Sequence, residues 1–157
     1  MARWANDGML RIHVVATISN IAAPTVTEIN AGTNITNFVT KDGLTVPANQ
    51  NNVPNASLAE TFDSEVPGSF GGAITMTGIR DNTTDTFWDL VVYNTVTHLV
   101  VRRGVATATA FSATQKVEVY PITWHEPVPL QTASNEQGRF SAMAPVRSQP
   151  NLKAVVA

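Results

Sequence analysis

Apolar and polar residues alternate along most of this chain, a period of two that is typical of β-strands with one buried face. From Met9 to Ile18, every even-numbered residue is apolar, whereas arginine, histidine and threonine occur at odd-numbered positions. A shorter strand is predicted around Ile35 to Val39. The remaining predicted strands are Ser57 to Asp63, Ala73 to Arg80, His98 to Arg103, Lys116 to Glu126, Arg139 to Pro145 and Leu152 to Val156. Of these, the strands Ser57 to Asp63 and Ala73 to Arg80 are expected to pair as antiparallel neighbours.

One stretch departs from this alternation and predicts a short helix. In the sequence TTDTFWDLVVY, apolar residues recur at helical spacing, and the helix is expected to run from Asp85 to Tyr93. Asn82 or Thr83 can cap its first turn by accepting hydrogen bonds from free backbone amides. The residues expected to pack on the sheet are Phe87, Leu90 and Val91.

Turn-forming residues separate the strands. The segment TVTEINAGTNIT predicts turns, Lys41-Asp42-Gly43 predicts a hairpin turn, and PGSFGG (Pro67 to Gly72) predicts a wide turn. The segment from Leu44 to Ser57 has two prolines and four asparagines with almost no apolar periodicity, so it is predicted to be a long loop. Pro121, inside a predicted strand, would be rejected by a central strand unless a bulge accommodates it.

The fold class that follows is mainly β, with two packed antiparallel sheets forming a sandwich or partial barrel and one short flanking α-helix. No repeat or linker divides the chain, so residues 1–157 are expected to form one domain. Within it, residues 1–23 and 146–157 are expected to be terminal strands or arms.

The composition favours self-association. Charged residues make up only 14% of the chain, against roughly 25% in a typical soluble domain, and the net charge is -2. The basic residues are scattered, which does not favour nucleic-acid binding as the main task. The chain has no cysteine, and no segment approaches the length of a membrane span. We therefore expect synthesis in the cytoplasm and no membrane partner.

No constellation of residues predicts an enzyme, a metal site or a cofactor site. The histidines lie in separate strand patterns without a second histidine at ligand spacing: His13, His98 and His125. Glu126 adjoins a histidine, but neighbouring strand residues point to opposite faces. The GSFGG segment around Ser69 lacks the lysine of a phosphate loop and the frame of a nucleophile elbow. We therefore predict that the protein is not an enzyme.

The tryptophans and the one pair of adjacent arginines are better candidates for packing or contacts between subunits. Trp88 lies in the helix pattern and Trp124 in a strand pattern, which favours buried or interface anchors. A lone pair of arginines at a strand end is more often a salt-bridge donor to another subunit than a phosphate site. The candidates for subunit contacts are Arg102, Arg103 and Trp124.

The order of these features resembles a known family. The segments PTVTEINAGTNIT, ETFDSEVPGSFGGAITMTGIRD, TTDTFWDLV, HLVVRRGV and KVEVYPI together look like the major tail proteins, or tail tube proteins, of long-tailed siphovirus-type phages, especially those of actinobacteria. The resemblance covers roughly Pro24 to Ile122, and the two ends of the chain fit less closely.

This resemblance implies a structural virion protein located in the tail tube. Six subunits would form a ring, stacked rings would form the conduit for phage DNA, and double-stranded DNA would pass without specific binding. It also implies a tape measure protein and tail terminator or baseplate proteins as partners. Exposed strand edges and low surface charge suit such assembly. The loop from Leu44 to Ser57 would reach the adjacent ring; its candidate contact residues are Val46, Pro47, Asn49, Asn51, Asn52 and Pro54.

Two further expectations stay open at this point. The bore could be lined by the polar face of the strand from Met9 to Ile18, or by that of the strand from Ala73 to Arg80. The alternative functions are a capsid decoration or other virion-surface binding module, which would form a small closed oligomer, and a carbohydrate-binding module. The latter would require Trp4, Trp88 and Trp124 to form an exposed platform.

Overall fold

The computed structural model describes residue 5 and residues 7–46 and 49–157, and it confirms the mainly β fold class. The elements in chain order are β1 (Leu10–Val15), α1 (Val26–Ala31), β2 (Thr33–Asn34), a 3-10 turn η1 (Thr36–Phe38), β3 (Val39–Thr45), β4 (Asn49–Pro54), β5 (Glu65–Gly71), β6 (Ala73–Ile79), α2 (Thr86–Leu90), β7 (Val96–Arg103), β8 (Lys116–Thr123), β9 (Val128–Pro129), β10 (Arg139–Pro145) and β11 (Asn151–Val155).

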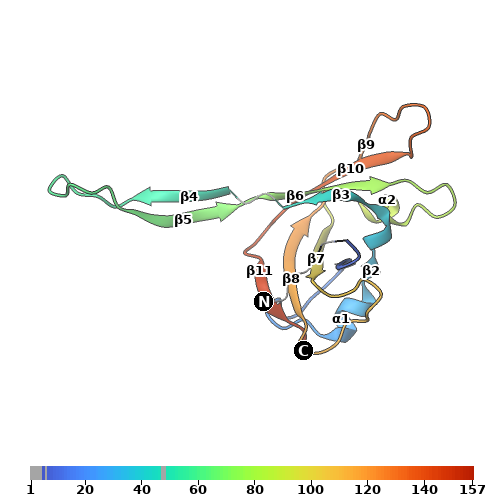
Figure 1. Ribbon diagram of the computed structural model, residues 1–157, viewed down its shortest axis with the longest axis horizontal. Coiled ribbons are helices and arrows are strands. Elements are labelled where there is room, and N and C mark those ends of the chain that lie inside the picture. Colours follow the sequence, from blue (N-terminus) through green and yellow to red (C-terminus); the bar gives the residue numbers. More distant parts are fainter. Residues whose placement is uncertain (1–4, 6, 47–48) are drawn as a thin grey trace.

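The strands form two larger antiparallel sheets and one separate hairpin. The five-stranded sheet has the order β11-β8-β7-β1-β2, and the four-stranded sheet has the order β3-β6-β10-β9. The four-stranded sheet lies across the five-stranded one, and the hairpin of β4 and β5 extends far from both (Figure 1). The arrangement is sandwich-like, as predicted, with an arm.

The main core fills the space between the two sheets. The five-stranded sheet contributes Ile12, Val14, Leu99, Val101 and Ile122, and the four-stranded sheet contributes Ile74, Met76, Phe140, Ala142 and Ala144. These side chains come from alternate positions of each strand, because successive residues point to opposite faces. Full burial of each larger apolar side chain stabilises the fold by about 1.5–3 kcal/mol.

The five-stranded sheet is covered on its second face as well. There Val15, Val100 and Val119 pack with Ile29 of α1 and with Phe111 of the loop between β7 and β8. The sequence predicted that the first strand is half-buried, and this is wrong: the last four residues of β1 are all buried. Its odd-numbered face therefore cannot line a bore.

Helix α1 was missed, because its asparagine and glycine residues were interpreted as turn signals. Thr25 begins the helix with a capping box: its hydroxyl accepts a hydrogen bond from the amide of Glu28, and the Glu28 carboxylate accepts one from the amide of Thr25. The same carboxylate accepts a hydrogen bond from the amide of Ser19 at 2.9 Å. These hydrogen bonds, from Thr25 first and then Ser19, lower the pKa of Glu28 to about 2.

Helix α2 lies where the sequence predicted a helix, but it is shorter. It ends at Leu90 because Val91 is already extended and Asn94 takes a left-handed φ of 60°, which turns the chain into β7. The predicted end of the helix at Tyr93 is wrong. A run of β-branched and aromatic residues after Leu90 has weak helix propensity, so the chain leaves the helix early.

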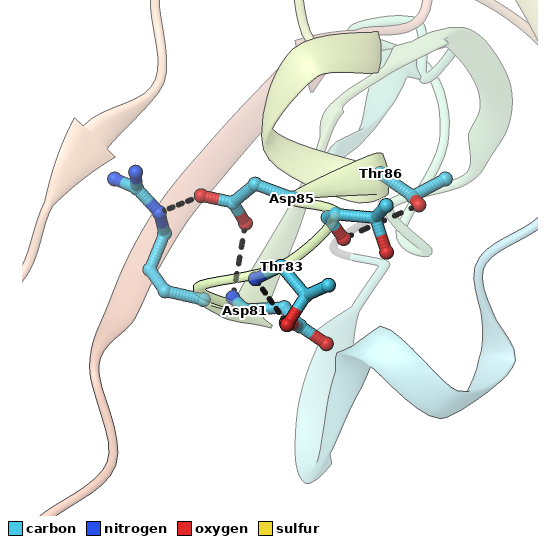
Figure 2. Close-up of polar contacts among 6 residues, drawn as sticks. Asp81, Thr83, Asp85 and Thr86 are labelled. Atoms are coloured by element: carbon cyan, nitrogen blue, oxygen red, sulfur yellow. Dashed lines mark hydrogen bonds and ion pairs between the residues drawn. The ribbon is translucent and has the colours of Figure 1, made fainter.

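The predicted caps of this helix, Asn82 and Thr83, are also wrong. Asp85 takes the N-cap position, and its side chain makes no capping hydrogen bond. Its carboxylate instead pairs with the guanidinium of Arg80 and accepts a hydrogen bond from the amide of Asp81 (Figure 2). Arg80 also stacks over the Trp88 ring at 3.8 Å from its centroid. The ion pair and the stacking together fix the link between β6 and α2.

Residues 44–72 depart most from the sequence prediction. The expected loop from Leu44 to Ser57 contains the end of β3 and all of β4, and the expected turn Pro67 to Gly72 is mostly strand β5. The expected strand from Ser57 to Asp63 is the turn at the tip of the β4–β5 hairpin. Instead of pairing with that segment, β6 pairs with β3 and β10.

Two smaller predictions concern strand irregularities. Lys41-Asp42-Gly43 does not form a hairpin turn; β3 runs through it with a register shift between Val39 and Leu44. A Cβ atom at Gly43 would lie 2.8 Å from the Thr77 carbonyl oxygen, which explains the glycine.

Pro121 lies inside β8, and its carbonyl accepts a hydrogen bond from the amide of Arg147. Its missing amide therefore faces the chain before β11, so the β7–β8 register is unbroken.

Candidate assembly surfaces

The hairpin of β4 and β5, residues 49–71, is here called the arm. Asn49 pairs with Gly71 at its root, and Pro54 pairs with Glu65 near its tip. All of β4 and most of β5 are exposed, and the arm extends away from both sheets (Figure 1). An isolated two-stranded hairpin is at best marginally stable in water. The arm therefore has the character of a segment that another chain covers.

The predicted contact residues lie along β4 and at its root. Asn49, Asn51, Asn52 and Pro54 are exposed on β4. The Asn51 amide donates to the Ser69 hydroxyl at 3.2 Å, and the Asn52 amide donates to the Glu65 carboxylate at 2.7 Å. These cross-strand contacts stabilise the hairpin register. Val46 packs against the main core, and Pro47 lies outside the described residues.

Strand β5 and residues 58–64 of the tip, which comprises residues 55–64, lie outside the inter-ring loop predicted from Leu44 to Ser57. Leu58 is fully exposed at 109% and Phe62 is 78% exposed, the two highest values among large apolar residues with described positions. Val53 and Val66 are directly opposite each other on the arm and are also exposed. The two matching Val-Pro pairs, at 53–54 and 66–67, were the sequence signal that could have indicated paired strands.

A cleft of about 870 Å³ lies at the root of the arm and is here called the root cleft. Its walls include Phe70, Arg103, Glu118, Tyr120, Arg147 and Leu152. Arg103 forms a 3.0 Å ion pair with Glu118, which also accepts a 2.8 Å hydrogen bond from the Tyr120 hydroxyl. Burial, and then this hydrogen bond, raises the pKa of Tyr120. The cleft thus combines apolar walls with an organised polar floor.

The outer face of the four-stranded sheet carries uncharged residues at its centre. Thr75, Thr77, Ser141 and Met143 alternate with the buried residues of β6 and β10, and Met143 is 45% exposed. Thr77 lies directly opposite Ser141, and Thr75 lies opposite Met143. The five-stranded sheet is covered on both faces, whereas no other segment among the described residues packs over this outer face.

Two of the three predicted subunit-contact residues are fully buried. Trp124 donates a 2.9 Å hydrogen bond from its indole to the Thr97 hydroxyl. Arg102 donates to the carbonyls of Ala106, Thr109 and Ala110 and to the Gln115 side chain. Burial, and secondarily Arg11, lowers the pKa of Arg102. Of the three candidates, Arg103 alone has a partly exposed side chain, in the root cleft.

The three residues expected to pack the helix against the sheet all pack against the core. Phe87 and Val91 are buried, and Leu90 is partly buried against the main core. The Phe87 ring lies 5.0 Å from Phe140 and 6.3 Å from Trp124, centroid to centroid. The helix thus fills the side of the core beside β10.

Among the residues that the structure describes, no histidine forms a hydrogen bond or ion pair with a carboxylate or with another histidine. His13 is buried and forms hydrogen bonds with the Ile29 carbonyl and with the Arg11 side chain. Burial lowers the pKa of His13. His98 has its pKa lowered mainly by burial, whereas His125 is exposed. Among residues 5, 7–46 and 49–157, no group of three His, Asp or Glu side chains could hold a metal ion. Within the same ranges, no helix has the length and apolar character needed to cross a membrane.

A family model described as phage tail tube protein matches residues 1–157. No curated protein sequence matches the chain.

Proposed function

Because the chain belongs to the phage tail tube protein family, and is therefore a structural protein of the virion tail that assembles into the tube, we propose that it forms stacked hexameric rings that conduct phage DNA. The family match extends the resemblance to both ends of the chain. Six subunits per ring is what the resemblance in sequence implies. The proposal assigns no enzymatic activity to the chain, and it has a tape measure protein and tail terminator or baseplate proteins as further partners.

The observation that carries the proposal is the exposed arm. Ordering a hairpin costs conformational entropy, and the arm's own two strands bury too little surface to offset that cost. In stacked rings, each arm would lie against a subunit of the adjacent ring and gain that buried surface. A contact between different surfaces of identical subunits that does not close produces an open stack. The contact residues proposed from the sequence, Asn49 to Pro54, then form one half of a larger surface that includes β5 and the tip.

The outer face of the four-stranded sheet is the proposed wall of the bore. Thr75, Thr77, Ser141 and Met143 carry no charge, so the wall at these positions would neither bind phosphates through counterion release nor repel DNA strongly. DNA would slide past without specific binding. The other candidate from the sequence, the odd-numbered face of β1, is covered by α1 and Phe111 and is withdrawn.

The first test is negative-stain electron microscopy of the purified protein at high concentration. We expect hollow tubes with a regular axial repeat and sixfold end-on views. A protein that forms only small closed oligomers under these conditions would support a decoration module and contradict the tube.

A second test removes the arm without disturbing its root. Gln50 and Phe70 are opposite each other, so an Asn-Gly turn can replace residues 51–69 and close the two strands with a favoured two-residue connection. We expect a folded subunit, with the thermal midpoint of the wild type within a few degrees, that no longer forms tubes. Normal tubes from this variant would refute the role of the arm in stacking.

A further inference from the structure

The tip of the arm combines exposed apolar side chains with negative charge. Leu58 and Phe62 are the two most exposed large apolar residues among those described. The sequence from residue 46 to residue 72 contains Glu60, Asp63 and Glu65 but no lysine or arginine. Exposed apolar residues beside charges of one sign are typical of a contact surface with a complementary partner.

The root cleft has the complementary character. Its apolar walls include Phe70 and Leu152, which are 50% and 55% exposed. Two basic residues, Arg103 and Arg147, line it together with one acidic residue, Glu118. Arg103 is already paired with Glu118, which leaves the exposed Arg147 as a cation at the rim. A volume of about 870 Å³ is in the range that accommodates bulky apolar groups.

The tip cannot fill the cleft of its own chain. From Glu65 to Gly71, strand β5 spans roughly 20 Å, at about 3.3 Å per residue. Pairing with β4 holds this strand extended, so the tip lies at the end of the arm that is far from the two sheets (Figure 1). The cleft is lined by residues at the opposite end, the root. Only another copy of the chain can bring a tip of this composition to the cleft.

We propose that the tip of one subunit docks in the root cleft of another copy, with Leu58 and Phe62 against Phe70 and Leu152 and with Glu60 near Arg147. This docking rests on the proposed stacking of rings and names the surface that receives the arm. Because the tip and the cleft are different surfaces at opposite ends of the arm, the contact is heterologous, and in a stack of rings it would repeat from each ring to the next.

A disulfide trap tests the docking directly, because the chain has no cysteine of its own. The variant with Phe62→Cys and Leu152→Cys is assembled into tubes, treated with an oxidant and separated by non-reducing electrophoresis. Docking brings the two thiols of adjacent copies within bonding range and produces a ladder of covalent multimers. The matched control replaces Leu152→Cys with Val128→Cys, at an equally exposed apolar residue on β9 that does not line the cleft; it should give no ladder.

A second variant does not depend on the thiol geometry. Leu58→Ser with Phe62→Ser changes only exposed side chains, so the subunit should fold normally, and the protein concentration needed for tubes should rise at least tenfold. Val128→Ser is its control and should leave that concentration unchanged. Tubes without a ladder, or tubes from the double serine variant at the wild-type concentration, would overturn the docking and leave the tube function intact. A wild-type protein that forms no tubes would overturn both proposals.

Discussion

The sequence made Arg102 a candidate for a contact between subunits, whereas the structure buries its side chain inside the protomer. A substitution of Arg102 tests this placement. Its two terminal nitrogens donate four hydrogen bonds of 2.8–3.1 Å to the loop between β7 and β8. The guanidinium also lies 4.7 Å from the centroid of the Phe111 ring. Arg102→Met keeps most of the apolar stem and removes every donor.

The expected loss of stability follows from these contacts. Three carbonyls and one side-chain oxygen lose a charged donor, and each buried acceptor left without a partner costs about 1–3 kcal/mol. The loop residues Ala106, Thr109 and Ala110 are exposed, so water can reach part of this set. We therefore expect a total loss of about 3 kcal/mol. For a chain of this size, that corresponds to a fall in the thermal midpoint of about 6–12 °C.

The assay is thermal unfolding of the unassembled subunit, followed by circular dichroism, with Arg103→Met as the matched control. Arg103 makes one ion pair with Glu118, and its side chain is 30% exposed. Removing this single, partly exposed ion pair should cost about 1 kcal/mol. An equal midpoint for Arg102→Met and Arg103→Met would refute the assignment of Arg102 to the protomer. So would an Arg102→Met subunit of wild-type stability that fails to assemble below its midpoint.

Two further predictions concern the acid stability of α1 and the wall of the bore. Because hydrogen bonds from Thr25 and Ser19 lower the folded-state pKa of Glu28 from 4.5 to about 2, its stabilising effect is present above pH 4.5 and is lost as the pH falls toward 2. In Glu28→Gln, the side chain does not titrate, and its single carbonyl oxygen can still accept the hydrogen bonds from Thr25 although its NH2 group cannot accept the one from Ser19. The urea midpoint of this variant should fall less steeply over that range; parallel pH profiles would contradict the assignment. Thr77→Lys should leave tubes intact but make them co-sediment with short double-stranded DNA at low salt and release it at high salt, whereas a variant that binds no DNA would place residue 77 away from the bore.

Local sequence patterns predicted the strands well where one periodicity prevailed. The strands β6, β7, β8, β10 and β11 are confirmed within a few residues of the predicted limits, because alternation and turn residues determine local backbone conformation. The position of α2 was also predictable, since Phe87 and Leu90 recur at helical spacing. The capping box of Thr25 and Glu28 was a local signal for α1 as well, although the neighbouring asparagines obscured it.

Apart from its two Val-Pro pairs, the arm carries little sequence signal of a hairpin. Strands are usually detected through one buried face, and neither β4 nor β5 has a buried face within its own chain. Asn51 and Asn52 therefore resembled loop residues, and the glycines of β5 resembled a turn. Their strand structure depends on pairing across the hairpin, between residues 11 to 22 positions apart in the chain.

The sequence by itself determined the β class, the resemblance to tail tube proteins and the limits of most strands, because those depend on neighbours along the chain. The tertiary structure alone decided which strands pair and which sheet faces are covered: both faces of the five-stranded sheet are covered, while the four-stranded sheet keeps an uncovered outer face. It alone also decided that Arg102 is internal and that a cleft lies at the root of the arm. These features depend on contacts between residues far apart in the chain, and the burial of a side chain is a property of everything packed around it rather than of its own segment.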